Sequence, residues 1–193
     1  MASEDSDRLS TAVKIVVAGG FGVGKTTMVG SVSEVPPLRT EELITEASTT
    51  VDDLAGIETK QTTTVALDFG RITISGDLIL YLFGTPGQHR FWFMWDELAH
   101  GALGAVVLAD TRRLDTCFPA VDFFERRGLP FIVAVNCFEN AHRYGADELR
   151  GALYLDPHIP VLLCDARDRS STKQVLTTLM HHVMAETRMA PTH

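Results

Sequence analysis

The sequence predicts an α/β fold: one domain with a mostly parallel six-stranded sheet, one strand of it antiparallel, and helices on both faces. Short apolar runs alternate along the chain with segments of helical character, and this alternation is typical of a doubly wound sheet. Most of the runs are too continuous for a sheet with one face in water, so both faces should be covered. The length of 193 residues and the hydrophobic content of 45% fit a single domain with a sizeable core.

The predicted strands follow from apolar runs bounded by turn residues. Five such runs are Val13–Ala18, Asp77–Phe83, Ala102–Asp110, Phe131–Asn136 and Val161–Cys164. A sixth strand, Thr64–Ile74, is separated from Leu78–Phe83 only by Ser75-Gly76-Asp77. That link is too short for a crossover helix, so these two strands should form an antiparallel hairpin.

The remaining segments are helices, one lead-in and one long connection. Helical candidates are Lys25–Val32, Ala120–Arg127, Ala146–Tyr154 and a last helix from Thr172 to about Thr187. Residues 1–10 are acidic and polar, which predicts a flexible lead-in, and residues 11–193 should form the domain. The polar, threonine-rich stretch Ser33–Thr63 is long for a structureless connection, so we expect it to be functional or mobile.

A glycine-rich loop links the first strand to the first helix with the spacing of a phosphate-binding P-loop, G-x-x-x-x-G-K-[ST]. Its backbone N–H groups and the helix N-terminus would surround a polyphosphate. Lys25 would add its charge near the terminal phosphates, and the hydroxyl of Thr26 would bind Mg²⁺. A purely structural glycine turn would not need a lysine and a threonine in this register. The predicted phosphate-binding residues are Gly19, Gly22, Val23, Gly24, Lys25, Thr26 and Thr27.

The composition disfavours several other classes of protein. A formal net charge of -8 argues against nucleic-acid binding and against electrostatic docking on an anionic membrane. The three cysteines are far apart and lack the C-x-x-C spacing of zinc or redox sites, which predicts reduced thiols in a cytoplasmic protein. The sequence shows neither an apolar signal segment nor a lipid-anchor motif, so recruitment to the inner face of the membrane would come through a partner.

Four further segments carry a resemblance to a known family. They are Thr64-Val65-Ala66-Leu67-Asp68-Phe69, Gly84-Thr85-Pro86-Gly87-Gln88, Asn136-Cys137-Phe138-Glu139 and Asp165-Ala166-Arg167. Together with the P-loop, their order resembles the five-motif series of small Ras-like GTPases over nearly the whole chain after residue 12. The Thr-Pro-Gly-Gln loop is most similar to the bacterial MglA-type GTPases. The stretch from Tyr81 to Trp92 is closer still to the GTPases of actinobacterial conservons.

This resemblance implies a role for each motif. Thr64 would contact Mg²⁺ and the γ-phosphate, although Thr62 and Thr63 precede it directly and leave the register open by a residue. Gly87 would sense the γ-phosphate through its backbone N–H, and Gln88 would orient the attacking water. The implied catalytic residues are Gln88, Gly87 and Thr64, and the implied metal ligands are Thr26 and Thr64.

Recognition of the base would fall to Asn136, Glu139 and Ala166. Asn136 ends an apolar strand at the carboxyl edge, where ligands of α/β folds bind. The carboxylate of Glu139 can accept from guanine N1–H and N2–H, donors that adenine lacks there, and the N–H of Ala166 would donate to the base carbonyl. Glu139 is longer than the usual aspartate, and Cys137 replaces the usual lysine. Adenine therefore stays an alternative to guanine.

A further departure concerns the metal. Gly84 stands where most small GTPases carry an aspartate that supports Mg²⁺, and it offers no ligand. Asp52, Asp53 and Asp68 are the nearest carboxylates in sequence that could substitute, although the ordinary role of each is that of a solvated loop or strand residue.

The aromatic run Phe91-Trp92-Phe93-Met94-Trp95 admits two interpretations. It could form a partner surface whose exposure depends on the nucleotide, or it could pack a short helix onto the sheet.

The sequence therefore predicts a GTP/GDP-binding switch with Mg²⁺ and slow, partner-stimulated GTP hydrolysis. The resemblance implies a roadblock-type regulatory protein and a sensor kinase-like complex as partners, with no nucleic acid and no direct membrane anchor. Two alternatives stay open: a nucleotide-binding scaffold with little or no hydrolysis, and a P-loop ATPase. The oligomeric state is not indicated.

Overall fold

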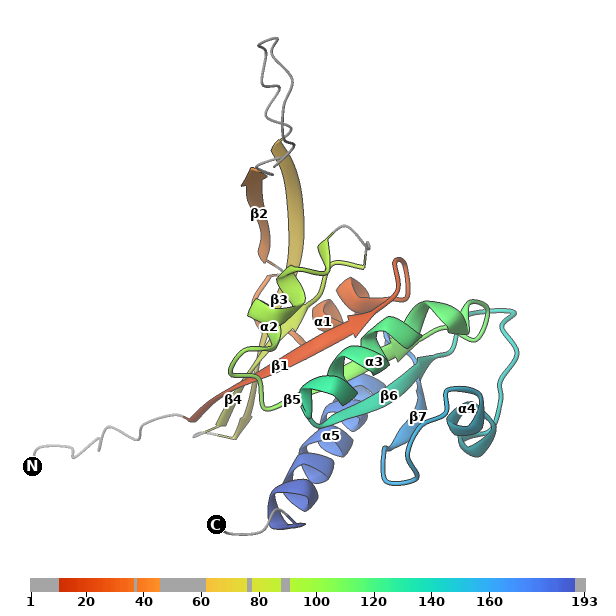
Figure 1. Cartoon of the computed structure of the whole chain (residues 1–193). Helices are drawn as coiled ribbons and strands as arrows, with labels where there is room; N and C mark the ends of the chain where they lie inside the picture. Colours follow the sequence, from red (N-terminus) through yellow and green to blue (C-terminus); the bar gives the residue numbers. More distant parts are fainter. Residues whose placement is uncertain (1–10, 37, 46–61, 76–77, 88–90, 190–193) are drawn as a thin grey trace, which may run out of the picture.

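The computed structural model describes residues 11–36, 38–45, 62–75, 78–87 and 91–189. Strands and helices alternate along most of this length (Figure 1). In chain order the elements are β1 (Thr11–Gly19), α1 (Lys25–Val32), β2 (Leu38–Thr45), β3 (Thr62–Ser75), β4 (Leu78–Gly84), α2 (Met94–Ala99), β5 (Gly104–Ala109), the 3-10 helix η2 (Leu114–Cys117), α3 (Phe118–Arg127), β6 (Phe131–Asn136), α4 (Ala146–Ala152), β7 (Val161–Cys164) and α5 (Arg169–Met189). The predicted lead-in, residues 1–10, lies outside the described residues.

The strands form one mixed sheet in the order β2-β3-β4-β1-β5-β6-β7. β1 pairs in parallel with β4 and β5, and β6 pairs in parallel with β5 and β7. β3 is antiparallel to both of its neighbours, β2 and β4, so within the described sheet it runs against all the other strands. This arrangement confirms the predicted fold class, including the single antiparallel strand.

The sheet has one strand more than the six predicted. The additional strand, β2, lies at the edge, inside the segment that the sequence predicts as a long connection. Its sequence, LRTEELIT, contains an arginine and two glutamates. Charged side chains are common on edge strands because they discourage pairing with other molecules, and they weaken the apolar pattern by which a strand is recognised.

β2 and the first half of β3 form a two-stranded ribbon. β3 pairs with β2 from Thr62 to Phe69, whereas its pairing with β4 begins only at Asp68. Figure 1 shows the ribbon projecting beyond the rest of the sheet. Asp68 therefore lies where the ribbon joins the sheet.

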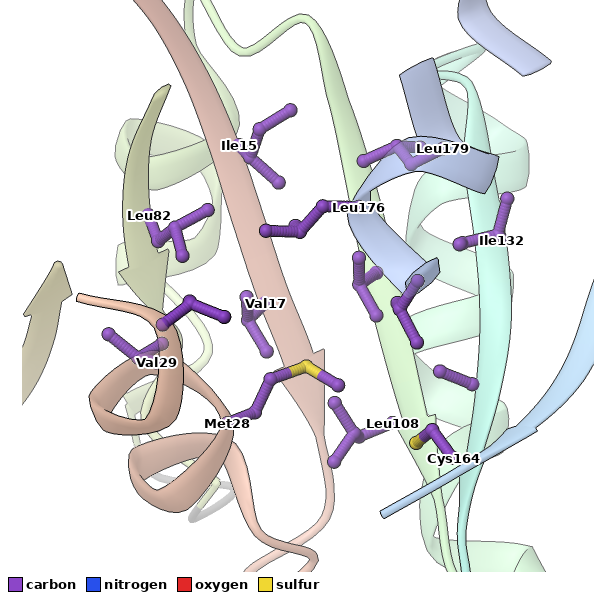
Figure 2. Close-up of a cluster of buried hydrophobic side chains, with 14 of the residues drawn as sticks. Ile15, Val17, Met28, Val29, Leu82, Leu108, Ile132, Cys164, Leu176 and Leu179 are labelled. Atoms are coloured by element: carbon purple, nitrogen blue, oxygen red, sulfur yellow. The ribbon is translucent and has the colours of Figure 1, made fainter. Parts of the chain in front are cut away.

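The central strands are buried on both faces, as their continuous apolar runs predict. On one face, Val17 of β1 belongs to a core with Met28 of α1 and Leu176 of α5 (Figure 2). On the other face, Val16 of β1 belongs to a core with Phe124 of α3. Adjacent residues of one strand thus pack into different layers of helices.

The aromatic run after β4 mainly packs α2 against the sheet. Phe91, Met94 and Trp95 are buried, and the ring of Trp95 packs edge-on against Phe123 of α3. Phe93 is 55% exposed. For Phe91, Met94 and Trp95, the structure therefore agrees with the interpretation that the run packs a short helix onto the sheet.

The parallel strands end along one edge of the sheet. β1, β4, β6 and β7 end at Gly19, Gly84, Asn136 and Cys164, and a predicted motif begins at or follows each end. Parallel pairing therefore brings motifs that are far apart in sequence to one place. Within the described residues, no helix combines the length and apolarity needed to cross a membrane.

Candidate nucleotide-binding site

The loop between β1 and α1 has a backbone that only glycine adopts readily. Gly19 and Gly24 have φ angles of 138° and 108°, a region that residues with side chains rarely occupy. A Cβ at Gly24 would also lie 2.7 Å from Nδ2 of Asn136. The loop therefore closes tightly against the end of β6, with its backbone turned around the start of α1.

Lys25 begins α1 and is buried beneath this loop. Its Nζ donates hydrogen bonds to the backbone carbonyls of Gly19 at 2.9 Å and Gly20 at 2.8 Å. Burial lowers the pKa of the amine to about 8, and the nearby carboxylate of Asp68 partly opposes this shift. An anion held in the loop would favour the charged amine, so Lys25 is suited to bind phosphate.

The hydroxyl of Thr26 donates a hydrogen bond to the carboxylate of Asp68 at 2.8 Å. Asp68 is paired with Gly84 in the ladder between β3 and β4. A Cβ at Gly84 would lie 2.8 Å from Cβ of Asp68 and 2.9 Å from its Oδ2. The side chain of Asp68 thus takes up the space that a side chain at position 84 would need.

Of the three carboxylates considered, Asp68 is the one among the described residues, and it contacts Thr26. Asp52 and Asp53 lie outside the described residues. A hydroxyl and a carboxylate oxygen suit Mg²⁺, which takes its remaining ligands from phosphates and water. In the part of the chain that the structure describes, no group of three or more His, Cys, Asp or Glu residues could hold a metal by itself. The predicted ligand Thr64 lies earlier in β3, opposite Leu43, and its side chain is not among those described.

Gly87 lies directly against the P-loop. A Cβ there would be 2.8 Å from Nζ of Lys25 and 2.8 Å from Cα of Phe21, so no other residue fits without displacement. The backbone of Gly87 is therefore beside the lysine predicted to bind the terminal phosphates. The predicted catalytic residue Gln88 lies outside the described residues.

Asn136 is buried at the end of β6 and links two other predicted segments. Its Nδ2 donates a hydrogen bond to the carbonyl of Val23 in the P-loop at 3.0 Å. Its Oδ1 accepts a hydrogen bond from the N–H of Ala166 at 3.0 Å, the same N–H that the resemblance assigns to the base. Asn136 therefore holds the phosphate-binding loop and the base-side loop together.

Glu139 lies on the open side of the base motif. Its side chain is 81% exposed, and its carboxylate pairs with Arg167 at 3.3 Å. Arg167 also pairs with Asp165 at 3.0 Å, and its hydrogen bonds lower the pKa of that carboxyl. Glu139 is thus positioned by a neighbouring cation but remains accessible to a ligand.

One loop beside the site carries no recognisable motif. It follows β5, from Asp110 to Arg113, and Asp110 is 1% exposed. The carboxylate of Asp110 accepts hydrogen bonds from the backbone N–H, Nε and Nη2 of Arg112. Nη2 of Arg113 donates a hydrogen bond to the carbonyl of Phe21 in the P-loop at 3.0 Å. The signal that could have found this loop is a carboxylate directly after a buried strand, at the edge where ligands bind.

Comparisons with known proteins show the family and the fold of this chain. A family described as conserved hypothetical ATP binding protein matches residues 17–186. The uncharacterized protein MJ1339 of Methanocaldococcus jannaschii is 33% identical over 126 residues, which cover 64% of this chain and 69% of that protein. The Ras-related protein RABC2a of Arabidopsis thaliana is 25% identical over 183 residues, which cover 89% of this chain and 77% of that protein.

Solved structures show the same fold at low identity. The FeoB G-domain from Methanococcus jannaschii has a TM-score of 0.60 at 12% identity, covering 90% of this chain and 99% of that chain. The cytosolic domain of the T. maritima FeoB iron transporter in a GDP form has a TM-score of 0.64 at 16% identity, covering 90% of this chain and 64% of that chain.

The family match covers most of the chain, and the Ras-related relative and the G-domain structures support a small GTPase-like P-loop fold. The chain therefore belongs to the family of conserved hypothetical ATP binding proteins, as a P-loop protein with a small GTPase-like G-domain fold that binds GTP or ATP.

Proposed function

We propose that this protein is a GTP-binding molecular switch that hydrolyses GTP slowly and binds the nucleotide with Mg²⁺. The observation that carries the proposal is the hydrogen bond of 2.8 Å from Thr26 to Asp68. It places a carboxylate beside the P-loop hydroxyl although Gly84 supplies none. Thr26 and Asp68 would therefore hold Mg²⁺ when a nucleotide is bound, as the P-loop hydroxyl and an acidic side chain do in P-loop proteins.

The residues of the chain would divide the work of binding and sensing. The N–H groups of the P-loop and the amine of Lys25 would bind the phosphates, and Thr26 and Asp68 would hold the metal. When bound, Mg²⁺ neutralises charge that develops on the phosphate oxygens. The N–H of Gly87 would detect the γ-phosphate, because its backbone lies beside Lys25. By resemblance, Gln88 would orient the attacking water.

We propose guanine as the base on the chemistry of Glu139. Its exposed carboxylate is an acceptor near Asn136, and guanine presents donors on that edge whereas adenine presents an acceptor. The second candidate, a P-loop ATPase, is favoured by the description of the family as ATP binding. The two candidates differ in which base the same loop must accept.

The choice of base is tested by Glu139→Gln. The amide cannot accept both guanine donors, but its N–H₂ can donate to the extra carbonyl of xanthine. We expect affinity for GDP to fall roughly 10- to 100-fold and affinity for xanthosine diphosphate to rise. Affinities are measured by competition against a fluorescent nucleotide. Glu125→Gln, an exposed change on α3, should leave the affinities for GDP and xanthosine diphosphate at their wild-type values. Tighter binding of ATP than GTP by the unchanged protein would overturn the guanine assignment and support an ATPase.

Hydrolysis is tested by following phosphate release from GTP with and without Mg²⁺. Without a partner that supplies an arginine, we expect turnover on the order of 10⁻⁴ s⁻¹. GTP that stays intact for many hours in the presence of Mg²⁺ would support the scaffold alternative instead.

We also propose the MglA or conservon type for this protein, with signalling as its role. Support comes from the sequence between Tyr81 and Trp92, which resembles those GTPases. A roadblock-type regulatory protein would then stimulate hydrolysis, and a sensor kinase-like complex would recruit the protein from the cytoplasm to the inner face of the membrane. Stronger binding of a purified roadblock-type protein to the GTP-loaded form than to the GDP-loaded form is the expected result. Equal binding to both forms would contradict a switch.

A further inference from the structure

We infer that the loop Asp110–Arg113 is a further nucleotide-contacting segment, in which Arg113 supplies positive charge to the nucleotide at the outer rim of the P-loop. This inference deepens the proposed function and rests on it. Neither the family match nor the motifs of the sequence assign a role to this loop.

Arg113 contacts the P-loop at Phe21, one residue after the carbonyls that Lys25 binds. Its Nη2 is 3.0 Å from the carbonyl of Phe21 and would be 3.6 Å from a Cβ at Gly22. Its side chain is 49% exposed, so the guanidinium reaches the surface of the loop. Within the described residues the guanidinium makes one hydrogen bond, the bond to Phe21. A guanidinium presents several N–H donors in one plane, so the others remain available to an anion.

Asp110 holds the loop in this position. Its carboxylate is buried, bonded to Arg112 at 2.7 Å and 4.0 Å from Nη2 of Arg113. The hydrogen bonds from Arg112 keep the pKa of Asp110 below its ordinary value, although burial acts in the opposite direction. A buried carboxylate that stays charged needs cationic partners, and here it orients two arginines toward the site.

The two arginines connect the two halves of the site. The guanidinium of Arg112 lies 3.9 Å from the centre of the Phe138 ring, between Asn136 and Glu139 in the base motif. Arg113 contacts the P-loop, as described above. Thr116, just beyond, is so close to Gly20 that a Cβ there would lie 2.5 Å from its Oγ1. The loop after β5 therefore flanks the site from the base side to the phosphate side.

A cation at this rim would offset two features of the sequence. Cys137 stands in the base motif where the resembling GTPases carry a lysine, so this motif brings no positive charge. The protein as a whole has a formal net charge of -8, which repels an anionic nucleotide at long range. Arg113, in the loop that follows β5, supplies a positive charge near the phosphates instead.

The test separates charge from loop shape by using Arg113→Gln. Glutamine keeps a polar side chain with N–H donors at this position, but it carries no charge. We expect Arg113→Gln to weaken GDP binding about 10-fold and to leave guanosine binding unchanged, because guanosine has no phosphate. Arg113→Lys should recover part of the loss. Arg126→Ala, an exposed arginine on α3, should behave like the unchanged protein.

Competition against a fluorescent GDP analogue measures all of these affinities, and thermal unfolding confirms that each variant is folded. Wild-type affinity for GDP in folded Arg113→Gln would overturn the inference. An equal loss for guanosine and GDP would also overturn it, since that result assigns Arg113 to loop shape alone. Failure of the unchanged protein to bind any guanine nucleotide would instead refute the proposed function.

Discussion

At the scale of single residues, Asp68 places a carboxylate beside Thr26, whereas Gly84 on the neighbouring strand carries none. It faces Gly84 across the ladder, and its side chain reaches Thr26 because position 84 has no side chain. Glycine at position 84 is thus a steric requirement for this placement of Asp68, since a larger residue would displace the Asp68 side chain. The two positions should therefore behave as a coupled pair.

Gly84→Asp tests this coupling. A Cβ at position 84 would lie 2.8 Å from Cβ of Asp68, and the new carboxylate adds charge repulsion. We therefore expect a loss of about 1–3 kcal/mol in the free energy of unfolding. Adding Asp68→Ala should restore most of the stability and keep the Mg²⁺ dependence of GDP binding. Asp68→Ala alone should lose that Mg²⁺ dependence. Urea unfolding and GDP affinity with and without Mg²⁺ measure these effects.

Gly151→Asp is the matched control, because a Cβ there meets nothing within 4 Å. Additive effects of the two changes at positions 68 and 84 would show that the positions do not share one space.

We expect Lys25 to make nucleotide binding depend on pH. Because its pKa in the folded protein is about 8, the fraction of neutral amine increases above pH 8. Phosphates bind the charged amine. We expect affinity for GDP to fall as the pH rises above 8, by up to roughly tenfold per pH unit. Lys25→Met should bind weakly and show no such slope. An affinity that stays constant from pH 7 to 10 in the unchanged protein would contradict the role of Lys25.

The lowered pKa of Lys25 affects the stability of the nucleotide-free protein in the opposite direction, because this stability rises with pH. The unfolded chain has a lysine pKa of 10.5 and binds more protons than the folded chain between pH 8 and 10.5. Through this group alone, the free energy of unfolding rises with pH in that window.

At the scale of elements, α5 covers one face of the sheet and carries a buried histidine near its end. His182 is 9% exposed, and its ring stacks with that of His158 at a centroid distance of 5.9 Å. Burial lowers the pKa of His182, while the charge of Glu186 acts in the opposite direction. Protonation therefore opposes the packing of α5.

Acid should weaken this packing. Because the folded pKa of His182 lies below the unfolded value of 6.5, the unfolded chain binds more protons as the pH falls. We expect His182→Gln to reduce the loss of unfolding free energy between pH 7 and pH 5, measured by urea unfolding. His181→Gln changes an exposed neighbour and should leave the loss unchanged. The same pH slope in His182→Gln and the unchanged protein would contradict this role.

At the scale of the whole molecule, nucleotide binding and folding should be linked. The P-loop, the Asp68 carboxylate and Asn136 come from separate elements and meet only in the folded state. At a nucleotide concentration of about 1,000 times Kd, binding stabilises the folded state by about 4 kcal/mol. For a chain of this size we expect the melting temperature to rise by roughly 10 °C.

Thermal unfolding with GDP and Mg²⁺ measures this linkage. Lys25→Ala should remove the rise, and Lys173→Ala, an exposed change on α5, should retain it. A rise of equal size in Lys25→Ala would place the nucleotide elsewhere.

Local signals predicted much of this fold. The apolar runs at Val13–Ala18 and Phe131–Asn136 correspond to β1 and β6, and the helix Lys25–Val32 has the predicted bounds. These elements have strong patterns because they are buried on both faces or begin at a glycine loop. β2 was not predicted, because a charged edge strand lacks that pattern. The bounds of α3 and α5 differ from prediction by a few residues, as helix ends depend on packing.

By itself, the sequence determined that this chain holds a phosphate-binding loop on a parallel sheet. A P-loop is a contiguous motif, so spacing alone reveals Lys25 and Thr26. Only the tertiary structure decided that Asp68 supports Thr26 and that Arg113 reaches Phe21. These contacts join residues from different strand ends, and their distances depend on how the strands pair and twist. A residue that acts across a ladder or between loops leaves no spacing in the sequence by which it could be found.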